Sequence, residues 1–432
     1  MIITHNNKNY TDNSKLAAQD TTFVISQQNE KYIEDAKANG CREFLKSTEL
    51  QSEFDFSSIK IVGVTGTNGK TTTTAAIYSL LLDLGYKVAL QGTRGFFIND
   101  ERVEEYTLTT PTQLGNFEHI SFAVDKDCDY FIMEVSSHAI EQGRIEGLEF
   151  DLKVHTNITQ DHLDYHGTLQ NYIDIKNSFF SDESMKLINK DDPNIKYNIK
   201  NCYAYGLDNP ATYKINAYSL RNGIHGAIQH FANVATFSSS MMGLFNVYNL
   251  TAAIGSVNLL TNKPLQEICN VMENFGGVSG RMEVVSSNPL IVIDFAHTHD
   301  GMEKVYESFQ EYDIISVFGA GGDRDRSKRP FMGEVAAKYS KEIIITSDNP
   351  RFEDPDQICE DILIGCKDMK HLEVELNRKV AIAKGMEKTK NYLNSVLLIL
   401  GKGDEETQII YDRKLPLNDK NIVEELLKET FK

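Results

Sequence analysis

The segment from residue 59 to residue 90 limits the possible folds of this chain more than any other. An apolar run, Ile59 to Val64, is followed by a glycine-rich turn, a helix-forming stretch from about Lys70 to Leu84 and a second apolar run from Lys87 to Leu90. Such short apolar runs predict buried strands, and a strand, a helix and a second parallel strand form a βαβ unit. The chain is therefore expected to contain an α/β domain with a parallel sheet.

The turn between this strand and this helix is suited to binding phosphate groups. Backbone N–H groups of such a turn and of the helix N-terminus point toward an anion. We expect Lys70 to neutralise the β- and γ-phosphates of ATP and the Thr71 hydroxyl to bind Mg²⁺. Val64 stands where the strict phosphate-loop pattern has its first glycine, so an ordinary glycine turn is the alternative. The expected ATP-binding residues are Gly66, Thr67, Asn68, Gly69, Lys70, Thr71 and Thr72.

Further strand-like apolar runs divide the chain into three parts. They lie at 130–135, 152–158, 290–297, 313–322, 342–350 and 395–403. Those of the second half end in Gly, Asp or Asn, and ligands of open α/β sheets bind at such carboxyl ends. The first 53 residues hold too little apolar sequence for a large core. We expect a mixed α/β protein of three domains: a small N-terminal α/β domain (1–53), a central phosphate-loop α/β domain (54–283) and a C-terminal Rossmann-like α/β domain (284–432).

The net charge limits the classes of partner. The formal charge is −18, which argues against general binding to nucleic acid or to an anionic membrane. An anionic substrate must then be held locally, and one candidate cluster is Arg324, Arg326, Lys328 and Arg329. The N-terminus has no signal-peptide pattern, no apolar run approaches the roughly 20 residues that span a bilayer, and the cysteines form no CxxC pair. We therefore expect a cytoplasmic protein.

Five further motifs follow the phosphate loop in a fixed order. They are Glu134–His138 (EVSSH), Asn157–Gly167 (NITQDHLDYHG), Asn246–Asn249, Gly280–Arg281 and Asp294–His297. Together with VTGTNGKTTT, this series resembles the Mur ligases and their relative folylpolyglutamate synthase over about residues 60 to 410. The resemblance implies an ATP- and magnesium-dependent ligase that forms an amide bond through an acyl phosphate.

The resemblance also implies roles in binding metal and ATP. Glu134 and His162, with Thr71, would bind Mg²⁺. Lys176 would be carbamylated and so carry a carboxylate-like anion near a second metal ion. Lysine reacts in this way only when deprotonated, so its pKa would have to be lowered locally. On spacing alone, Lys176 reads as a surface lysine of a helix. The implied catalytic residues are Lys70, Glu134, His162 and Lys176, and the implied further ATP contacts are Asn249, Arg281 and Asp294.

Two more groups of residues are implied to bind the other substrates. The contacts of a sugar-peptide precursor would be Ser14, Thr109, Thr110, Ser136, Gln142 and Arg144, all neutral or cationic donors suited to anionic groups. The segment Asp348-Asn349-Pro350-Arg351 is similar to the one with which diaminopimelate-adding Mur ligases hold the incoming amino acid, although it also fits a turn that ends a strand. Arg324, Gly401 and Glu405 would complete that pocket, whereas Asp404 stands where the family usually has His.

The chemistry of this pocket fits an amino acid with a distal carboxylate and ammonium. Arg324, Asn349 and Arg351 can bind the carboxylate, and Asp348 can receive the ammonium. The implied function is addition of meso-diaminopimelate to UDP-N-acetylmuramoyl-L-alanyl-D-glutamate in peptidoglycan precursor synthesis. We expect small-molecule substrates, no nucleic-acid or membrane partner, and a monomer.

Three other functions stay open at this point. A folylpolyglutamate synthase shares the phosphate loop but should lack the DNPR segment and the Gln142/Arg144 pair. A phosphate-loop ATPase without ligase activity would leave the other motifs without a role. A noncatalytic module that only binds the precursor would have no need of Lys70. Phosphate release that depends on an amino acid would separate a ligase from the last two.

Overall fold

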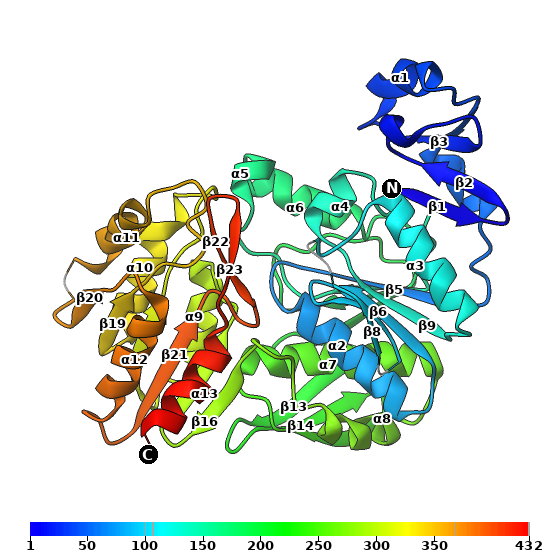
Figure 1. Cartoon of the computed structure of the whole chain (residues 1–432). Helices are drawn as coiled ribbons and strands as arrows, with labels where there is room; N and C mark the ends of the chain where they lie inside the picture. The colour runs from blue at the N-terminus through cyan, green and yellow to red at the C-terminus, as the bar shows by residue number, and fades with distance from the viewer. Residues whose placement is uncertain (100, 106–107, 368, 431–432) are drawn as a thin grey trace.

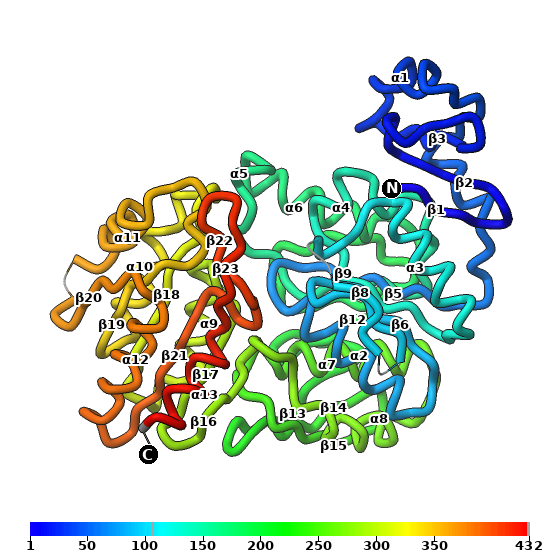
Figure 2. Tube along the Cα trace, in the orientation of Figure 1, coloured from blue at the N-terminus to red at the C-terminus, as the bar shows by residue number. Residues whose placement is uncertain are grey.

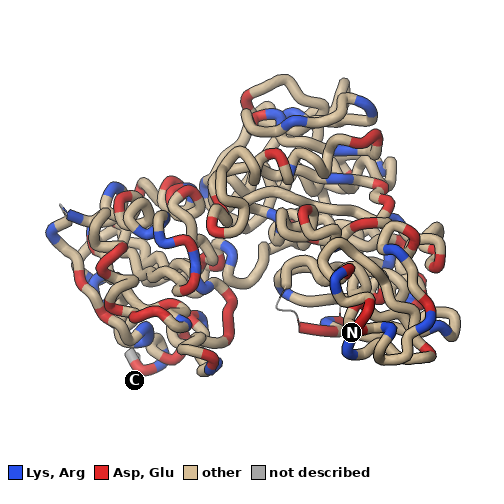
Figure 3. Tube along the Cα trace, turned by 90° about the horizontal axis from the view of Figure 1, so that it is seen from above, with Lys and Arg blue, Asp and Glu red and all other residues tan. Residues whose placement is uncertain are grey.

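The computed structural model of the chain describes residues 1–99, 101–105, 108–367 and 369–430. The described strands form three larger sheets and one hairpin, and these follow one another along the sequence (Figure 1). The colours of the tube change in order from the N-terminal to the central to the C-terminal part (Figure 2). Acidic and basic residues are interleaved along the whole trace (Figure 3). The mixed α/β fold class expected from the sequence is confirmed.

The N-terminal part is a four-stranded sheet with one short helix. Strands β1 and β2 are antiparallel, whereas β3 runs parallel to β2, and β4 runs parallel to β3. Ile3, Tyr10 and Leu50 of its core pack against Leu114 and Phe117, which belong to the central part. A segment of this size buries little surface by itself, and the neighbouring helix completes its core. The bounds are β1 Ile2–His5, β2 Lys8–Thr11, β3 Thr21–Ile25, α1 Ile33–Ala38 and β4 Glu43–Lys46.

The central part is built on an eleven-stranded sheet in the order β15-β14-β13-β12-β11-β10-β5-β9-β6-β7-β8. The strands from β13 to β6 in this order are parallel, and antiparallel strands extend both edges. The expected βαβ unit is present, with β9 inserted between its two strands. The bounds are β5 Lys60–Thr65, β6 Val88–Gly92, β7 Gly95–Ile98, β8 Glu101–Glu104, β9 Tyr130–Glu134, β10 Leu152–His155, β11 Lys186–Asn189, β12 Cys202–Gly206, β13 Tyr213–Ser219, β14 Ile224–His230 and β15 Asn233–Ser239.

Helices cover both faces of the parallel strands. Ile77 of α2 and Leu250 of α7 pack with Val64 of β5 in one core, and Ile120 of α3 packs with Phe131 of β9 in another. Burial on both faces explains why these strands appear in the sequence as continuous apolar runs. The helices are α2 Lys70–Asp83, α3 Gln113–Asp125, α4 Ser137–Glu141, α5 Leu163–His166, α6 Leu169–Ser178, α7 Leu244–Thr261 and α8 Leu265–Val271.

The C-terminal part is a six-stranded sheet in the order β16-β17-β21-β18-β19-β20. All neighbours are parallel except the edge strand β16. Met302 of α9 and Met332 of α10 pack on one face, whereas Ile382 of α12 and Val423 of α13 pack on the other. The bounds are β16 Glu283–Ser287, β17 Leu290–Asp294, α9 His299–Glu307, β18 Asp313–Phe318, α10 Lys328–Tyr339, β19 Glu342–Ile345, α11 Pro355–Leu363, β20 Leu372–Val374, α12 Arg378–Thr389, β21 Ser395–Leu400, the hairpin strands β22 Thr407–Ile410 and β23 Arg413–Pro416, and α13 Asp419–Thr430.

The carboxyl ends of the parallel strands carry the sequence motifs. Gly66 follows β5, Glu134 is the last residue of β9, and Asp294 is the last residue of β17. Asp348 and Gly401 come just after β19 and β21. Loops at these ends are where ligands of open α/β sheets bind, so the topology brings residues from distant motifs together.

Candidate active site

A cleft of about 1610 Å³ lies between the central and C-terminal parts. Its walls come from the phosphate loop, from the end of β9, from segments after β6, β8 and β10, and from the loops that follow β17, β18, β19 and β21. The predicted residues that line it are Thr67, Asn68, Gly69, Lys70, Thr71, Thr109, Glu134, His162, Arg281, Arg324, Asp348, Asn349, Arg351, Gly401 and Glu405. Residues predicted to contact three different ligands thus face one space.

The phosphate loop is held from behind by the segment that follows β10. The Thr67 amide donates to the Asn157 carbonyl at 2.7 Å, and the Asn68 amide donates to Asn157 Oδ1 at 3.0 Å. Gly69 has a φ of +83°, and a Cβ there would lie 2.3 Å from Asn249 Oδ1, so both the backbone and the space require glycine. Lys70 Nζ donates to the carbonyls of Gly66 and Thr67 at 2.8 and 2.9 Å. The lysine therefore lies folded over its own loop.

Glu134 links the phosphate loop to the strand end beside it. Its side chain is buried, and Oε2 accepts hydrogen bonds from the hydroxyls of Thr71 at 3.0 Å and Thr93 at 3.2 Å. Oε1 accepts from the Thr93 amide at 2.8 Å. Two predicted metal ligands, Thr71 and Glu134, are therefore in direct contact, and Thr93 is a neighbour that the sequence had not indicated.

His162 lies on the same cleft with an unusual backbone. Its φ is +53°, in the left-handed region that costs a non-glycine residue free energy and that often marks functional sites. Nε2 is 3.4 Å from Asp161 Oδ2, and the ring meets His138 edge to face. Partial burial lowers the pKa of His162 to about 4, which favours the neutral imidazole that can bind a metal ion.

Lys176 is not a surface lysine. It lies on α6 with 1% of its surface exposed, and Nζ donates to the Gly66 carbonyl at 2.8 Å, directly behind the phosphate loop. Burial, with the nearby Lys70 charge, lowers the pKa of Lys176 well below that of a free lysine. Lys176 shares the Gly66 carbonyl with Lys70, another predicted catalytic residue, and its amine loses a proton more readily than that of a free lysine.

The remaining predicted ATP contacts lie around the loop. Thr72 and Asn249 are buried beside it, and Asn249 Oδ1 accepts from the Thr73 hydroxyl at 3.4 Å. The Arg281 guanidinium lies 4.1 Å from the ring centroid of Phe295. The Asp294 carboxylate accepts from the backbone amides of Met282 and Ala296, both at 2.7 Å. Asp294 thus shapes the turn beside Arg281.

Five of the six predicted precursor contacts form one cluster. Thr110 Oγ1 donates to the Glu134 carbonyl at 2.9 Å and lies 3.4 Å from Ser136 Oγ, and Thr109 Oγ1 accepts from the Thr93 hydroxyl at 3.2 Å. Arg144 donates to the Thr110 carbonyl and to the Gln142 side-chain oxygen. The sixth, Ser14, lies in the N-terminal part, where its carbonyl accepts from Asn39. The structure does not bring Ser14 into contact with the cluster.

The predicted amino-acid residues form a second cluster on the opposite wall. Asn349 Nδ2 donates to Glu405 Oε2 at 2.8 Å, and Arg351 Nη1 donates to the Gly322 carbonyl at 2.8 Å. Arg351 has a φ of +52° and, like Arg324, lines the cleft; burial and the Arg324 charge lower the pKa of Arg351. Two cations held close together in this way favour binding of an anion.

A close approach explains the glycine in this cluster. Gly401 has a φ of +108°, and a Cβ at this position would lie 2.8 Å from Asp348 Oδ2. Asp348 and Glu405 bring negative charge to the same cleft wall as the two arginines. Pro350, the remaining predicted residue, packs its carbonyl against Gly322, where a Cβ would lie 1.9 Å from that oxygen. The cluster can therefore bind a group that carries both a carboxylate and an ammonium.

The expected cluster of four cations is wrong in part. Arg329 is fully buried, and it pairs with Glu353 at 3.0 Å and Asp361 at 2.8 Å. Arg326 also pairs with Glu353, at 2.9 Å. Only Arg324 and Lys328 of the four line the cleft. The partners of Arg326 and Arg329 come from α11 and the loop before it, more distant in the sequence, so the charge run alone could not show which side chains were free to meet a ligand.

Three contacts between the central and C-terminal parts could not be predicted from the sequence. Asp300 Oδ2 at the start of α9 accepts from Asn68 Nδ2 at 3.2 Å and from the Thr159 hydroxyl at 3.0 Å. Arg94 pairs with Asp404 Oδ2 at 3.0 Å. Asp404, the residue that departs from the family pattern, therefore joins the central part to the C-terminal part. No motif spacing indicated any of these contacts.

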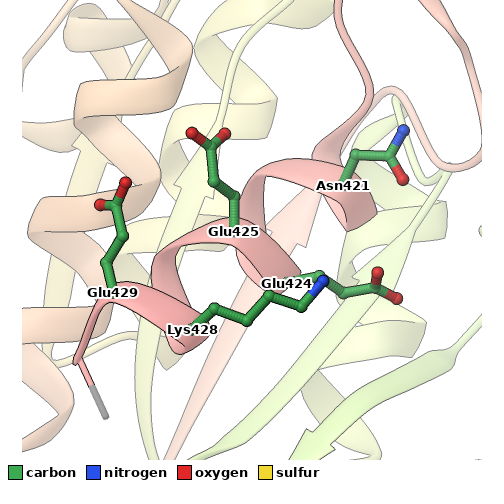
Figure 4. Close-up of a pocket in the computed structure, with 5 residues that line it drawn as sticks. All are labelled: Asn421, Glu424, Glu425, Lys428 and Glu429. Atoms are coloured by element: carbon green, nitrogen blue, oxygen red, sulfur yellow. The ribbon is translucent and has the colours of Figure 1, made fainter. Parts of the chain in front are cut away.

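A second, smaller hollow of about 410 Å³ lies along α13. It is lined by Asn421, Glu424, Glu425, Lys428 and Glu429, which come from this one helix (Figure 4). It contains none of the predicted residues and offers mainly carboxylates to a ligand. The large cleft is therefore the candidate active site.

Family models match most of the chain. The Mur ligase middle domain matches residues 64–257, and the glutamate ligase domain of Mur ligases matches residues 280–403. The chain belongs to the Mur ligase family. The resemblance found in the sequence motifs is thus confirmed, and the cleft lies between the two matched domains of this Mur ligase.

Curated relatives are similar to this chain over nearly its full length. The UDP-N-acetylmuramoyl-L-alanyl-D-glutamate--2,6-diaminopimelate ligase of Wolinella succinogenes is 52% identical over 96% of this chain and 94% of its own. The enzyme of the same name from Helicobacter pylori is 49% identical over 93% of this chain and 91% of its own.

Solved structures are also similar to the fold of this chain. A UDP-N-acetylmuramoyl-L-alanyl-D-glutamate--2,6-diaminopimelate ligase matches this Mur ligase with a TM-score of 0.68 and 29% identity, over 98% of this chain and 95% of that one. Folylpolyglutamate synthase of Mycobacterium tuberculosis also has a TM-score of 0.68, but at 14% identity and over 82% of this chain and 91% of its own. The second match shows a shared fold alone. Among the described residues of this Mur ligase, no helix is both long and apolar enough to cross a membrane.

Proposed function

We propose that this Mur ligase joins meso-diaminopimelate to UDP-N-acetylmuramoyl-L-alanyl-D-glutamate and converts ATP to ADP and phosphate as it does so. The observation that carries the proposal is that the Asp348–Arg351 segment and the phosphate loop line one cleft. The names of the relatives that are about half identical over nearly the whole chain support the same reaction. Its product would be a precursor of peptidoglycan.

The reaction would proceed in two steps. The terminal carboxylate of the precursor attacks the γ-phosphorus of ATP, which gives an acyl phosphate and releases ADP. The amine of diaminopimelate then attacks the acyl carbon, and phosphate leaves from the tetrahedral intermediate. Lys70 would exchange its two loop carbonyls for phosphate oxygens, and the loop N–H groups would stabilise the charge that moves during transfer.

The residues around Thr71 fit a magnesium ion that is bound together with phosphate. Among the described residues, no group of three or more His, Cys, Asp and Glu is arranged to hold a metal ion. Mg²⁺ needs no such cage, because it usually takes one or two protein oxygens, waters and substrate phosphates. The Thr71 hydroxyl and the buried Glu134 carboxylate, 3.0 Å apart, supply such oxygens, and we propose His162 as a further ligand. The ion would neutralise phosphate charge during transfer.

We propose that Lys176 carries a carbamate in the active enzyme. The amine lies behind the phosphate loop, and its lowered pKa supplies the neutral nitrogen that reacts with carbon dioxide. The product is an anion in a place where the unmodified side chain contacts a hydroxyl, a carbonyl and the ring of Tyr172. Such an anion would balance the charge of Lys70 and of metal bound nearby.

The remaining clusters would hold the two substrates that are joined. We propose that Thr109, Thr110, Ser136, Gln142 and Arg144 bind the precursor, with Ser14 contributing from the N-terminal domain. Arg324 and Arg351 would bind the distal carboxylate of diaminopimelate, and Asp348 and Glu405 its distal ammonium. The proposed domains are residues 1–53, 54–283 and 284–432. Closure of the last two would exclude water from the acyl phosphate.

Phosphate release tests this proposal. Purified protein with ATP, Mg²⁺ and the UDP-linked dipeptide is given meso-diaminopimelate, L-lysine, L-glutamate or no amino acid. We expect release with diaminopimelate only, and only when the precursor is present. Release that needs no amino acid would indicate an ATPase, and glutamate-dependent release with a folate in place of the precursor would indicate the related synthase.

A further inference from the structure

Lys402 is a buried cation in the wall of the amino-acid pocket. None of its side chain is exposed, and it lies between Gly401 and Glu405 in the loop after β21. Nζ donates to Asn349 Oδ1 at 3.1 Å, to Glu405 Oε2 at 2.7 Å and to the Thr407 carbonyl at 2.8 Å. An ammonium has three N–H donors, so this group is fully satisfied by three different segments of the pocket.

The partners of Lys402 are also joined to each other. Asn349 Nδ2 donates to Glu405 Oε2, and Asn349 Oδ1 accepts a second hydrogen bond, from the Ile409 amide at 2.9 Å. Glu405 Oε2 therefore receives both Lys402 and Asn349, whereas no described residue donates to Oε1. One oxygen of the carboxylate is fixed by the protein, and the other remains for a ligand in the cleft that Glu405 lines.

The same lysine ties the β22–β23 hairpin to the pocket. Thr407, whose carbonyl it binds, begins β22. Gln408 of that strand donates to the Asp348 carbonyl at 2.7 Å, and the Arg351 amide donates to the Ile409 carbonyl at 3.1 Å. Asp348, Asn349 and Arg351 are thus all hydrogen-bonded to β22, and Lys402 lies where β22, Asn349 and Glu405 meet.

We propose that Lys402 is a positioning residue that fixes Glu405 and Asn349 in the orientation that receives the distal ammonium of diaminopimelate. This inference rests on the function proposed above. Lys402 is buried behind its partners, so it acts through them and touches no substrate itself. A charge-assisted hydrogen bond is strong and directional, which suits a group that must hold one carboxylate oxygen and leave the other free.

The proposal assigns the effect of Lys402 to one substrate. Its three partners all lie in the amino-acid pocket, and the phosphate loop belongs to the other wall of the cleft. Loss of the ammonium should raise the KM for diaminopimelate and leave the KM for ATP near its original value. A residue that served only to keep the domain folded would instead lower the fraction of active enzyme and leave both KM values unchanged.

The test compares Lys402→Met with Lys186→Met. Lys186 is a second fully buried lysine, on β11, whose ammonium donates to the backbone carbonyls of Asp182 and Lys200. We expect Lys402→Met to raise the KM for diaminopimelate by about 10- to 100-fold, the effect of losing hydrogen bonds to a charged group. Lys186→Met should leave that KM unchanged. If Lys402→Met does not fold, Lys402→Gln, which keeps an N–H donor, undergoes the same measurement.

A double-mutant cycle separates positioning from direct binding. If Lys402 acts through Glu405, Lys402→Met combined with Glu405→Gln should raise the KM for diaminopimelate little more than the larger single effect. Additive effects, or an unchanged KM in both Lys402 variants, would overturn the proposal while diaminopimelate ligation by the unsubstituted enzyme upheld the function. If the unsubstituted enzyme ligated no diaminopimelate, the function and this inference would fall together.

Discussion

At the scale of single residues, burial decides what a side chain can do. Lys176 has the sequence surroundings of a surface lysine, yet it is 1% exposed and bonded to the phosphate loop. Lys402 and Arg329 are likewise fully buried cations with carboxylate partners. A buried cation with ordered partners acts by fixing those partners, so its removal affects the site even where it meets no ligand.

We predict that Lys176→Ala lowers ligation by about 10- to 100-fold, the range seen when a group that supports a metal site is removed. Acetate or a similar small carboxylate should restore part of the activity, because it can replace the proposed carbamate. Turnover is measured with and without the added acid, and Lys186→Ala serves as a buried-lysine control. A fully active Lys176→Ala variant would contradict the carbamate.

A second prediction concerns stability in acid. His119 is buried against Phe96, and burial lowers its pKa to about 4. The unfolded chain, with a histidine pKa near 6.5, binds a proton more readily than the folded chain. The free energy of unfolding therefore keeps the full contribution of the neutral His119 above about pH 6.5 and loses it as the pH falls toward 4. The loss from this residue is up to about 3 kcal/mol. We expect His119→Gln to flatten the fall in unfolding free energy between these values.

Denaturant titrations at several pH values measure that slope. His225→Gln, which changes an exposed histidine on β14, is the matched control and should keep the original slope. An unchanged slope in His119→Gln would mean that other groups account for the loss of stability in acid.

The residues that the sequence could predict are those that motifs mark by themselves. Residues of the phosphate loop, Glu134, His162 and residues of the Asp348–Arg351 segment all line the large cleft. Lys402, Arg94 and Asp300 could not be predicted, because each acts on partners that are distant in the sequence or lie across the cleft. Local patterns record backbone geometry and ligand chemistry, but not which long-range partners a side chain meets.

At the scale of elements, long apolar runs were predictable and short polar strands were not. Strands β5, β9, β10, β17, β18, β19 and β21 are buried on both faces and appear as apolar runs. Strands β13, β14 and β15 lie at an edge of the sheet, with exposed residues such as Tyr218 and Val234, and their composition is mixed. Edge strands receive part of their stability from pairing with the sheet, which leaves a weaker pattern in the sequence.

The Arg94–Asp404 pair gives a prediction at this scale, because it joins the end of β6 to the loop after β21. The side chains are 38% and 31% exposed, so the pair is worth at most about 1 kcal/mol. We expect Arg94→Ala to raise the KM for diaminopimelate by about 2- to 5-fold. Added salt should raise the KM for diaminopimelate of the wild-type enzyme more than that of the variant.

Charge reversal identifies the cause of that effect. The double variant Arg94→Asp with Asp404→Arg should recover most of the affinity that either single change loses. Lys200→Ala, which breaks an ion pair with Glu183 inside the central part, is the control and should have no effect. Failure of the double variant to recover would show that Arg94 contributes something other than its charge.

At the scale of the whole molecule, two α/β parts carry complementary halves of the site. The central part holds the phosphate loop and the proposed precursor contacts, and the C-terminal part holds the amino-acid cluster. The side-chain contacts Asn68–Asp300, Thr159–Asp300 and Arg94–Asp404 connect them. Met242 and Phe245 of the central part also pack against the C-terminal core. We propose that a movement of the two parts closes the cleft and brings the acyl phosphate and the amine together.

The measurement that tests the proposed reaction most directly is a competition between two amino acids. Enzyme, ATP, Mg²⁺ and the UDP-linked dipeptide are mixed with equal concentrations of meso-diaminopimelate and L-lysine, and the products are distinguished by mass. Lysine lacks the distal carboxylate and would leave Arg324 and Arg351 unpaired, which can disfavour a substrate by about 10⁴- to 10⁵-fold.

We therefore predict a product that contains diaminopimelate with almost no lysine product. Arg351→Ala should lose most of the diaminopimelate product while still binding ATP, because the phosphate loop lies on the other wall of the cleft. If the unsubstituted enzyme incorporated lysine as readily as diaminopimelate, the assignment of the Asp348–Arg351 segment to the distal carboxylate would be wrong.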